Sequence, residues 1–378
     1  MDKKIKILVT SIGSLVGQNI QESLEFNASN RRDKVNLIGT NSIAESPNNY
    51  KCDYCYLVPN TSTNEYELII KKIIREVEPD LILSGRDEDT EAIYRIMESN
   101  PDLKGKVPYG NLDTLLFALD KMKTWEFSKK YKLPFAESIE VKKNSDKKSY
   151  LDFIKKVGFP LIAKPVRGYA SKGVFFIRNN EDINFVLELD GYMLQEYLGD
   201  PELLETYFRL MEGPIPLFSH APNVIHYSCH TILAPNGEIA PVFISKNEHD
   251  AGRTLGFTKV ENKDLEKLTL DYANALFKEG GAGPVTVQFR KDRNGKWKAQ
   301  EMNMRTNGNT FPRLMLGQDD IGLIIKYFVS DFDFPILKNK DENNYLVSKS
   351  LLSNFINSNE IETLRTTKKW TKASEEIE

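Results

Sequence analysis

A predicted β-hairpin within residues 281–317 constrains the fold more than any other part of the sequence. This stretch reads GAGPVTVQFRKDRNGKWKAQEMNMRTNGNTFPRLMLG, with two short alternating segments on either side of Asn294-Gly295. An Asn-Gly pair between alternating segments is the strongest short-range signal for a tight hairpin. A two-residue turn at this pair places Arg293 opposite Lys296 and fixes the register of both strands.

That register predicts a group of oxygen-bearing side chains on one face of the hairpin. Gln288 falls opposite Glu301, and the alternation of side chains adds Asn303 and Arg305 to the same face. Hard oxygen ligands suit Mg²⁺, which keeps positions open for water and substrate phosphates. The spacing therefore predicts a metal site formed by Gln288, Glu301 and Asn303. An ordinary solvated hairpin face remains the alternative.

Composition indicates a soluble chain of two or three domains. Of the 378 residues, 40% are hydrophobic and 28% are charged, and the net charge of −3 gives no overall field that would attract nucleic acid or a membrane. The three cysteines are too few for a disulfide framework. There is no signal peptide and no apolar run of about 18 residues, so we expect a cytoplasmic protein. A homo-oligomer is compatible with these features.

The N-terminal segments predict an α/β domain. Residues 5–10 (IKILVT) form a continuous apolar run that is typical of a buried parallel strand, and residues 11–17 (SIGSLVG) follow as a loop of small residues before a helix. Strand, loop and helix in this order are typical of a Rossmann-like unit. The second strand ends at Thr40-Asn41, where a dinucleotide site would place an acid, so the signal for NAD is weak.

The end of a later strand in this domain predicts one wall of a substrate site. Residues 81–83 precede the polar run Ser84-Gly85-Arg86-Asp87-Glu88-Asp89. Ligands bind beyond the carboxyl ends of parallel strands, and helix N-termini favour anions there. An ordinary helix cap with acids near the helix dipole is the alternative. The predicted substrate residues are Ser11, Gly13, Arg86, Asp87 and Glu88.

A lysine inside an apolar strand is the main feature of the middle of the chain. Lys164 lies within FPLIAKP (residues 159–165), and a buried lysine is rare without a partner. The loop over residues 166–172 contains small residues that let the backbone approach phosphates closely. Further upstream, Lys121 follows Asp120 at the predicted start of a helix. An exposed lysine at a helix start is the alternative for Lys121, and a surface lysine is the weaker alternative for Lys164.

In order along the chain, these segments resemble the ATP-grasp superfamily, in particular the group that includes the carbamoyl-phosphate synthetase large subunit. Glu301-Met302-Asn303-Met304-Arg305 is similar to that family's metal-binding motif Glu-x-Asn-Pro-Arg, with Met304 in place of proline. Gln195-Glu196-Tyr197-Leu198 is similar to its hinge. The resemblance covers residues 1–330.

The resemblance implies a role for each matching residue. His226 occupies the position of the acid that usually holds the ribose. Apart from the resemblance, His226 and His230 are expected to share one face of a strand, so a zinc site is an alternative there. The implied nucleotide contacts are Lys121, Lys164, Ser171, Lys172, Gly173, Gln195, Glu196, Tyr197, Leu198 and His226. The implied metal ligands are Gln288, Glu301 and Asn303, and the implied catalytic cations are Lys246, Arg253 and Arg305.

The fold expected from the resemblance is α/β, with a Rossmann-like domain (1–113) before a two-lobed ATP-grasp fold (114–195 and 196–330) and a C-terminal extension (331–378). The expected activity is an ADP-forming ligase that uses ATP and Mg²⁺, or Mn²⁺, to join a carboxylate to an amine or thiol through an acyl phosphate. The expected partners are a small carboxylate and a small amine. A small-molecule kinase, an NAD(P)-dependent oxidoreductase and a non-catalytic nucleotide-binding protein are the alternatives.

Overall fold

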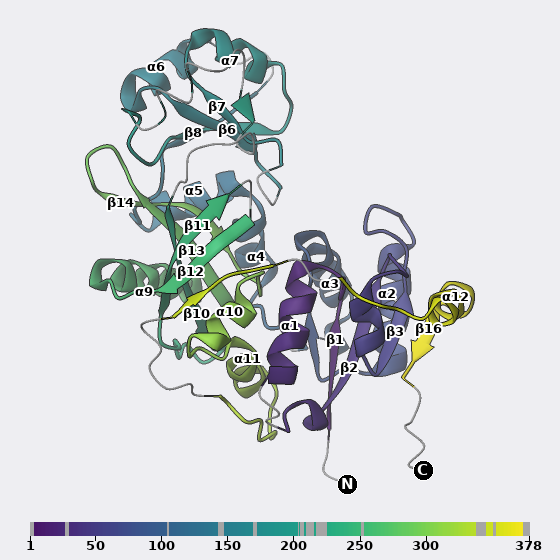
Figure 1. The fold of residues 1–378 in the computed structure, drawn as a ribbon. Helices are drawn as coiled ribbons and strands as arrows, with labels where there is room; N and C mark the ends of the chain where they lie inside the picture. The colour runs from purple at the N-terminus through teal and green to yellow at the C-terminus, as the bar shows by residue number, and fades with distance from the viewer. Residues whose placement is uncertain are drawn as a thin grey trace, which may run out of the picture.

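Three β-sheets with their covering helices make up the molecule (Figure 1). The computed structural model describes residues 4–26, 30–103, 106–142, 147–168, 172–202, 204, 208, 215–216, 225–250, 253–337, 345–350 and 353–372. Within these ranges, no helix combines the length and the apolar content that a membrane crossing requires.

The N-terminal domain is built on a sheet with strand order β16-β3-β2-β1-β4. The parallel strands are β1 (Ile5–Val9), β2 (Val35–Asn41), β3 (Tyr54–Leu57) and β4 (Leu81–Leu83). The connecting elements are α1 (Leu15–Glu25), η2 (Arg32–Lys34), η3 (Pro47–Lys51), α2 (Tyr66–Val77), α3 (Asp87–Ser99) and η4 (Pro101–Leu103). Parallel pairing confirms the Rossmann-like opening predicted from the sequence.

Both faces of this sheet are buried, which explains why its strands are continuously apolar. Ile7 and Val9 pack on one face with Ile20 of α1, whereas Leu8 packs on the opposite face with Ile70 of α2. In α2 the buried positions Tyr66, Ile70, Ile73 and Ile74 follow helical spacing.

The middle lobe is an antiparallel sheet with strand order β5-β8-β6-β7-β9. Its strands are β5 (Ser138–Glu140), β6 (Leu161–Pro165), β7 (Phe175–Ile177), β8 (Tyr192–Glu196) and β9 (Ile215–Pro216), and its helices are α6 (Lys147–Val157) and α7 (Asn180–Leu187). In Figure 1 this lobe lies above the other two sheets, with α6 and α7 on its outer side.

The third sheet is also antiparallel and has the order β14-β13-β10-β11-β12-β15. Its strands are β10 (His226–Leu233), β11 (Phe243–Asp250), β12 (Arg253–Lys259), β13 (Gly283–Lys291), β14 (Trp297–Asn303) and β15 (Leu346–Val347). Val287 and Phe289 face a core formed with α4 (Leu112–Leu119), α5 (Lys121–Lys130) and α9 (Lys263–Lys278). The opposite face carries the side chains of Gln288 and Glu301, which pair directly.

Helices α4 and α5 pack on β14 of this third sheet, although the sequence placed residues 114–195 together in the middle lobe. Ala136 N donates to Ala299 O, and Ala299 N donates to Pro134 O. These two hydrogen bonds tie the segment after α5 to β14. The domain boundaries over this region therefore stay a prediction.

The C-terminal extension connects two sheets that are far apart in the chain. After α10 (Thr310–Met315) and α11 (Asp320–Phe328), β15 pairs with β12, and then α12 (Ser358–Thr367) and β16 (Lys369–Thr371) reach the N-terminal sheet. There β16 pairs antiparallel with β3. Figure 1 shows this yellow segment crossing from the third sheet to the far edge of the N-terminal domain.

Candidate active site

The predicted pairing of Gln288 with Glu301 is present in the hairpin of β13 and β14. Thr286 lies opposite Asn303, so the three predicted metal ligands share one face of the sheet. Asn303 Nδ2 donates to Glu301 Oε1 at 3.3 Å, which shows that these two side chains meet. One carboxylate and two amides supply oxygen ligands of the type that Mg²⁺ prefers. The donor set therefore fits a magnesium ion that completes its shell with phosphate and water.

The turn of this hairpin differs from the prediction. Asp292 N donates to Lys296 O at 2.8 Å, so three residues rather than two form the loop, and Arg293 does not pair with Lys296. Gly295 has a φ of 76°, which a glycine adopts at no steric cost. The register then shifts by one at a bulge formed by Gln300. The extra residue of the bulge in β14 offsets the extra residue of the loop, so Gln288 still pairs with Glu301.

Lys164 extends from the middle lobe to the face of the third sheet that carries the predicted metal ligands. Its side chain is buried, and Nζ donates to Gln195 Oε1 at 2.7 Å and to Gln300 O at 3.1 Å. Burial lowers the pKa of Lys164 to about 7, although the nearby Glu301 carboxylate acts in the opposite direction. Lys121 Nζ donates to the carbonyl of Gly168, at the start of the predicted lid. The structure thus brings the predicted phosphate-binding lysine next to the predicted metal ligands.

The hinge residues lie at the end of β8, which pairs with β6, the strand that carries Lys164. The Glu196 carboxylate accepts from Lys298 Nζ at 2.8 and 2.9 Å and from Glu137 N at 3.1 Å. The Glu196 amide donates to Glu137 O, so this amide is already used within the protein. Tyr197 packs its ring against the middle lobe and Leu198 is buried in the core of the third sheet. The main-chain groups of Tyr197 and Leu198 are therefore the better candidates for reading the edge of a base.

Two histidines occupy the same face as Gln288, because Ser228 pairs with Gln288 and side chains alternate along β10. His226 Nε2 is 3.3 Å from Asn247 Nδ2. His230 is fully buried, with Nδ1 2.7 Å from Thr286 Oγ1, and burial together with the Arg313 charge lowers its pKa. Among the residues that the structure describes, no group of three His, Cys, Asp or Glu side chains is placed to hold a metal. The structure therefore gives no support to the zinc alternative.

Of the predicted catalytic cations, Lys246 is on the wrong face of the sheet. It pairs with Tyr227, whose other partner is the core residue Phe289, so it points away from Gln288. Its ammonium is 3.3 Å from Glu248 in an exposed ion pair. The physical reason is the alternation of side chains along β11, which turns Lys246 to the face opposite Gln288. The role predicted for Lys246 does not fit this position.

Four further predicted residues lie in or next to the segments around residues 171 and 253. Ser171 and the side chain of Arg253 lie outside the described residues. Lys172 and Gly173 are exposed on the approach to β7. Their predicted roles in the lid and at the phosphoryl group stay predictions.

Arg305 is joined to the N-terminal domain by an ion pair that the sequence did not predict. Its Nη2 donates to Asp87 Oδ2 at 3.0 Å, and its Nε bonds the other carboxylate oxygen of the same residue. Burial opposes the charge of the guanidinium, but Asp87 raises the pKa of Arg305 above its ordinary value. Asp87, a predicted substrate residue, and Arg305, a predicted catalytic cation, thus form an ion pair with each other.

The wall predicted from the first strand–loop–helix unit lies next to this pair. Ser11 has a φ of 45°, and a Cβ on Gly13 would come within 2.3 Å of Ser46 Oγ, so the loop is tightly folded. Ser14 caps α1 and donates its hydroxyl to Gly85 O at 3.0 Å, which joins the loop to the start of α3. Arg86 and Glu88 flank Asp87 there and are half-buried.

The sequence reading missed several residues of the cleft, most clearly Gln300 and Arg290. Gln300 supplies the carbonyl to Lys164, and its side chain donates to Gln288 Oε1 at 3.2 Å. Arg290 lies two residues after Gln288 on the same face, and burial lowers the pKa of its guanidinium to about 10. Continuing the alternation past Gln288 would have identified Arg290. Nothing in the sequence marked the bulge at Gln300.

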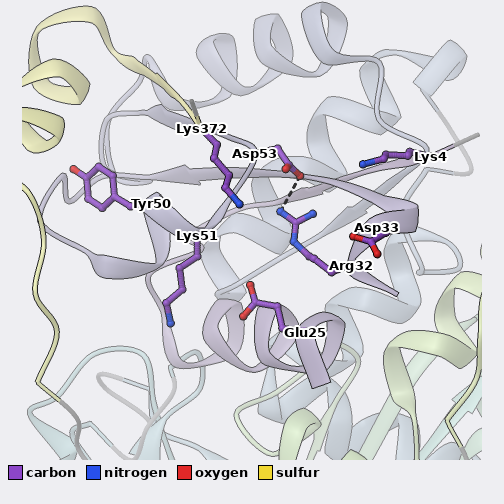
Figure 2. Close-up of a pocket in the computed structure, with 8 residues that line it drawn as sticks. All are labelled: Lys4, Glu25, Arg32, Asp33, Tyr50, Lys51, Asp53 and Lys372. Carbon is purple, nitrogen blue, oxygen red and sulfur yellow. Dashed lines mark ion pairs between the residues drawn. The ribbon is translucent and has the colours of Figure 1, made fainter. Parts of the chain in front are cut away.

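A charged hollow of about 460 Å³ lies at the opposite edge of the N-terminal sheet (Figure 2). In Figure 2 the side chains of Arg32 and Lys372 approach Asp53, and Arg32 forms an ion pair with it at 2.9 Å. Asp53 precedes β3 and Lys372 follows the antiparallel β16, so the hollow is at the amino ends of the parallel strands. It is therefore separate from the site formed by Lys164 and Glu301.

A scan of protein-family models finds no match for this sequence, and a search of curated proteins finds none either. Solved structures, however, are similar over most of the chain. N5-carboxyaminoimidazole synthetase from Staphylococcus aureus complexed with ADP has a TM-score of 0.66 at 15% identity, covering 89% of this chain and 81% of that one. Biotin carboxylase from Campylobacter jejuni has a TM-score of 0.65 at 16% identity, with 88% and 72% covered. L-amino acid ligase from Bacillus licheniformis has a TM-score of 0.60 at 13% identity, with 89% and 78% covered.

All three are ATP-grasp enzymes. In this protein the sheet of β1–β4, to which β16 is added at one edge, comes first along the chain, followed by the sheet of β5–β9 and then by that of β10–β15. The α/β fold class predicted from the sequence is therefore confirmed. The chain has the ATP-grasp fold.

Proposed function

We propose that this protein is an ATP- and Mg²⁺-dependent ligase that joins a small carboxylate to an amine, or to a thiol, and forms ADP. The observation that carries the proposal is the hydrogen bond from Lys164 of the middle lobe to Gln300 O of the metal-binding hairpin. It sets a phosphate-binding cation beside Glu301 across the cleft between two lobes. Phosphoryl transfer needs positioning and charge neutralisation and no protein nucleophile, which is what this site offers.

The similar solved structures support this assignment. The S. aureus synthetase is complexed with ADP, and the biotin carboxylase domain of a 2-oxoglutarate carboxylase from Hydrogenobacter thermophilus is complexed with MgADP and bicarbonate. We place the present protein with the carbamoyl-phosphate-synthetase-like group of this fold. We also propose that it acts in the cytoplasm and that Mn²⁺ can replace Mg²⁺, since both cations accept oxygen ligands.

In the proposed reaction the residues of this chain hold and orient the reactants. Lys164 and Lys121 neutralise charge on the nucleotide phosphates, and Gln288, Glu301 and Asn303 hold the metal. When bound, Mg²⁺ withdraws charge from the phosphate oxygens. Arg305 stabilises the negative charge that develops as the phosphoryl group moves to the carboxylate. The resulting acyl phosphate is then attacked by the amine.

The alternatives are less well supported. A kinase would use the same nucleotide site and stop at the phosphorylated product, so product analysis separates it from a ligase. An NAD(P)-dependent oxidoreductase would need an acid at the end of β2, whereas Asn41 there bonds Asn49 inside the protein at 2.9 Å. A non-catalytic nucleotide-binding protein would have no need for the arrangement of Gln288, Glu301 and Asn303 on one face.

The test is ADP release from ATP and Mg²⁺ with a panel of small acids and amines. We expect release that depends on both a carboxylate and an amine, and we expect Glu301→Gln to reduce it by at least 100-fold, on the order of the loss of one strong electrostatic contact. Lys246→Gln, on the opposite face of the sheet, is the matched control and should retain activity. A fully active Glu301→Gln enzyme would show that the hairpin is only structural.

A further inference from the structure

The ion pair between Asp87 and Arg305 joins the predicted substrate wall of the N-terminal domain to the end of the strand that carries the predicted metal ligands. Arg305 follows the predicted metal ligand Asn303 by two residues, and Asp87 begins α3 at the carboxyl edge of the N-terminal sheet. The two side chains are 218 residues apart in sequence and bridge two domains. A carboxylate that reaches the transferred phosphoryl group from outside the nucleotide cleft arrives at this pair.

Both members of the pair remain partly open to solvent. The side chain of Arg305 is 15% exposed and that of Asp87 is 22% exposed. In contrast, the pair formed by Arg31 and Asp319 is 0% exposed on both sides, as expected of a purely structural contact. A small ligand can therefore reach the Asp87–Arg305 pair without first opening a closed core.

The charges of Asp87 and Arg305 determine which ligand can separate the two side chains with little loss of free energy. A simple carboxylate that binds Arg305 displaces Asp87 and leaves that half-buried carboxylate without its cation, which is unfavourable. A ligand that carries both a carboxylate and an ammonium group exchanges one ion pair for two. Each protein charge then keeps an opposite partner after the substrate has bound.

The surroundings of Asp87 favour the ammonium group on that side. Asp87 and Glu88 begin α3 next to a single cation, Arg86, whereas Asp89 is buried against Tyr66, whose hydroxyl donates to it at 2.7 Å. The Oε2 atom of Glu88 is buried and has no hydrogen-bond partner among the described residues. Buried acceptors of this kind are normally satisfied, so a donor from a ligand would complete the site.

We propose that the acceptor substrate is an amino acid, whose carboxylate pairs with Arg305 and whose ammonium group pairs with Asp87. This inference rests on the proposed ligase function and specifies its substrate class. A carboxylate oxygen attacks the γ-phosphorus of ATP, the bond from that phosphorus to the β–γ bridging oxygen breaks, and ADP leaves. The amine of the second substrate then attacks the acyl carbon, phosphate leaves and the amine loses a proton, so an amide forms.

The experiment compares amino acids with the carboxylic acids that lack only the amino group, such as L-alanine with propionate and L-glutamate with glutarate. Hydroxylamine replaces the unknown second amine and traps each acyl phosphate as a hydroxamate. We expect the wild-type enzyme to prefer the best amino acid over its deamino counterpart by at least tenfold in kcat/KM. Asp87→Asn should reduce this preference to below threefold and leave the affinity for MgATP unchanged.

Two further variants distinguish recognition from a loss of structure. Asp87→Glu retains the carboxylate and should retain most of the preference, and Glu98→Gln, at an exposed position near the end of the same helix, should retain all of it. Equal use of both acids by the wild type, or an undiminished preference in Asp87→Asn, would overturn the inference while the ligase proposal stands. ATP binding without ADP release for any acid would contradict the ligase proposal and the inference together.

Discussion

Lys164 is the residue whose chemistry depends most on its burial. In the unliganded protein, burial lowers its pKa to about 7, so the side chain is mostly neutral at pH 8. Nucleotide phosphates next to Nζ would favour the ammonium form and raise this pKa again. Binding and protonation are therefore coupled at this residue.

We predict that the protein takes up close to one proton per molecule when MgATP binds at pH 8. The proton binds to Lys164, because the pKa of Lys164 is higher in the MgATP complex than in the free protein. Calorimetry in two buffers with different ionisation enthalpies measures this number directly. Lys164→Met should abolish the uptake, whereas the exposed Lys123→Met should leave it unchanged. Equal uptake in wild type and Lys164→Met would show that another group binds the proton.

At the scale of single residues, the sequence predicted positions on the hairpin better than contacts between domains. Gln288 and Glu301 are opposite each other as predicted, although a three-residue loop together with the bulge at Gln300 sets this register. The sequence did not show that Lys246 lies on a strand, β11, whose alternation turns it away from Gln288. The pairing of Asp87 with Arg305 depends on how two domains pack, and no local pattern carries that information.

At the scale of elements, the hairpin of β13 and β14 was predicted with a turn one residue too short, and the bulge at Gln300 compensates for the difference. The loop contains three residues, and the extra residue in β14 restores the pairing of Gln288 with Glu301. The same bulge turns the Gln300 carbonyl toward Lys164. Bulges often mark sites where a strand must redirect a group, and no sequence signal announced this one.

We predict that deletion of Gln300 leaves the hairpin folded, because the ladder then runs without interruption from Ala299 to Glu301 and Glu301 still faces the cleft. The deletion removes the carbonyl that accepts from Lys164. Loss of a hydrogen bond to a charged group costs roughly 1.5–3 kcal/mol, so we expect MgATP to bind at least about tenfold more weakly. Titration calorimetry and circular dichroism test both parts. A deletion variant that binds MgATP like wild type would show that this carbonyl does not orient the lysine.

At the scale of the whole molecule, buried polar contacts hold the N-terminal domain against the third sheet. Arg31 and Asp319 form an ion pair at 2.9 Å that is fully buried on both sides, and the guanidinium also lies 4.8 Å from the centre of the Phe334 ring. Asp319 in addition caps α11 by accepting from Gly322 N. These long-range contacts were outside the reach of sequence patterns, whereas the order of the three sheets followed from the motifs.

We predict that Arg31→Met lowers the free energy of unfolding by about 3–5 kcal/mol, because Asp319 is then buried without its cation. Urea denaturation followed by tryptophan fluorescence measures the change. Arg365→Ala breaks the exposed ion pair with Glu45 and should leave the urea concentration at the midpoint of unfolding nearly unchanged. Similar midpoints for wild type and Arg31→Met would mean that the interface does not depend on this charge.

The pairing of β16 with β3 has a consequence for the synthesis of the protein. The N-terminal domain leaves the ribosome first, yet its sheet has an unpaired edge at β3 until residues 369–371 have been translated. At 5–20 residues per second this interval is roughly 15–60 s. During that time the nascent domain exposes the strand edge to other chains, and a chaperone that shields it would increase the yield of folded protein.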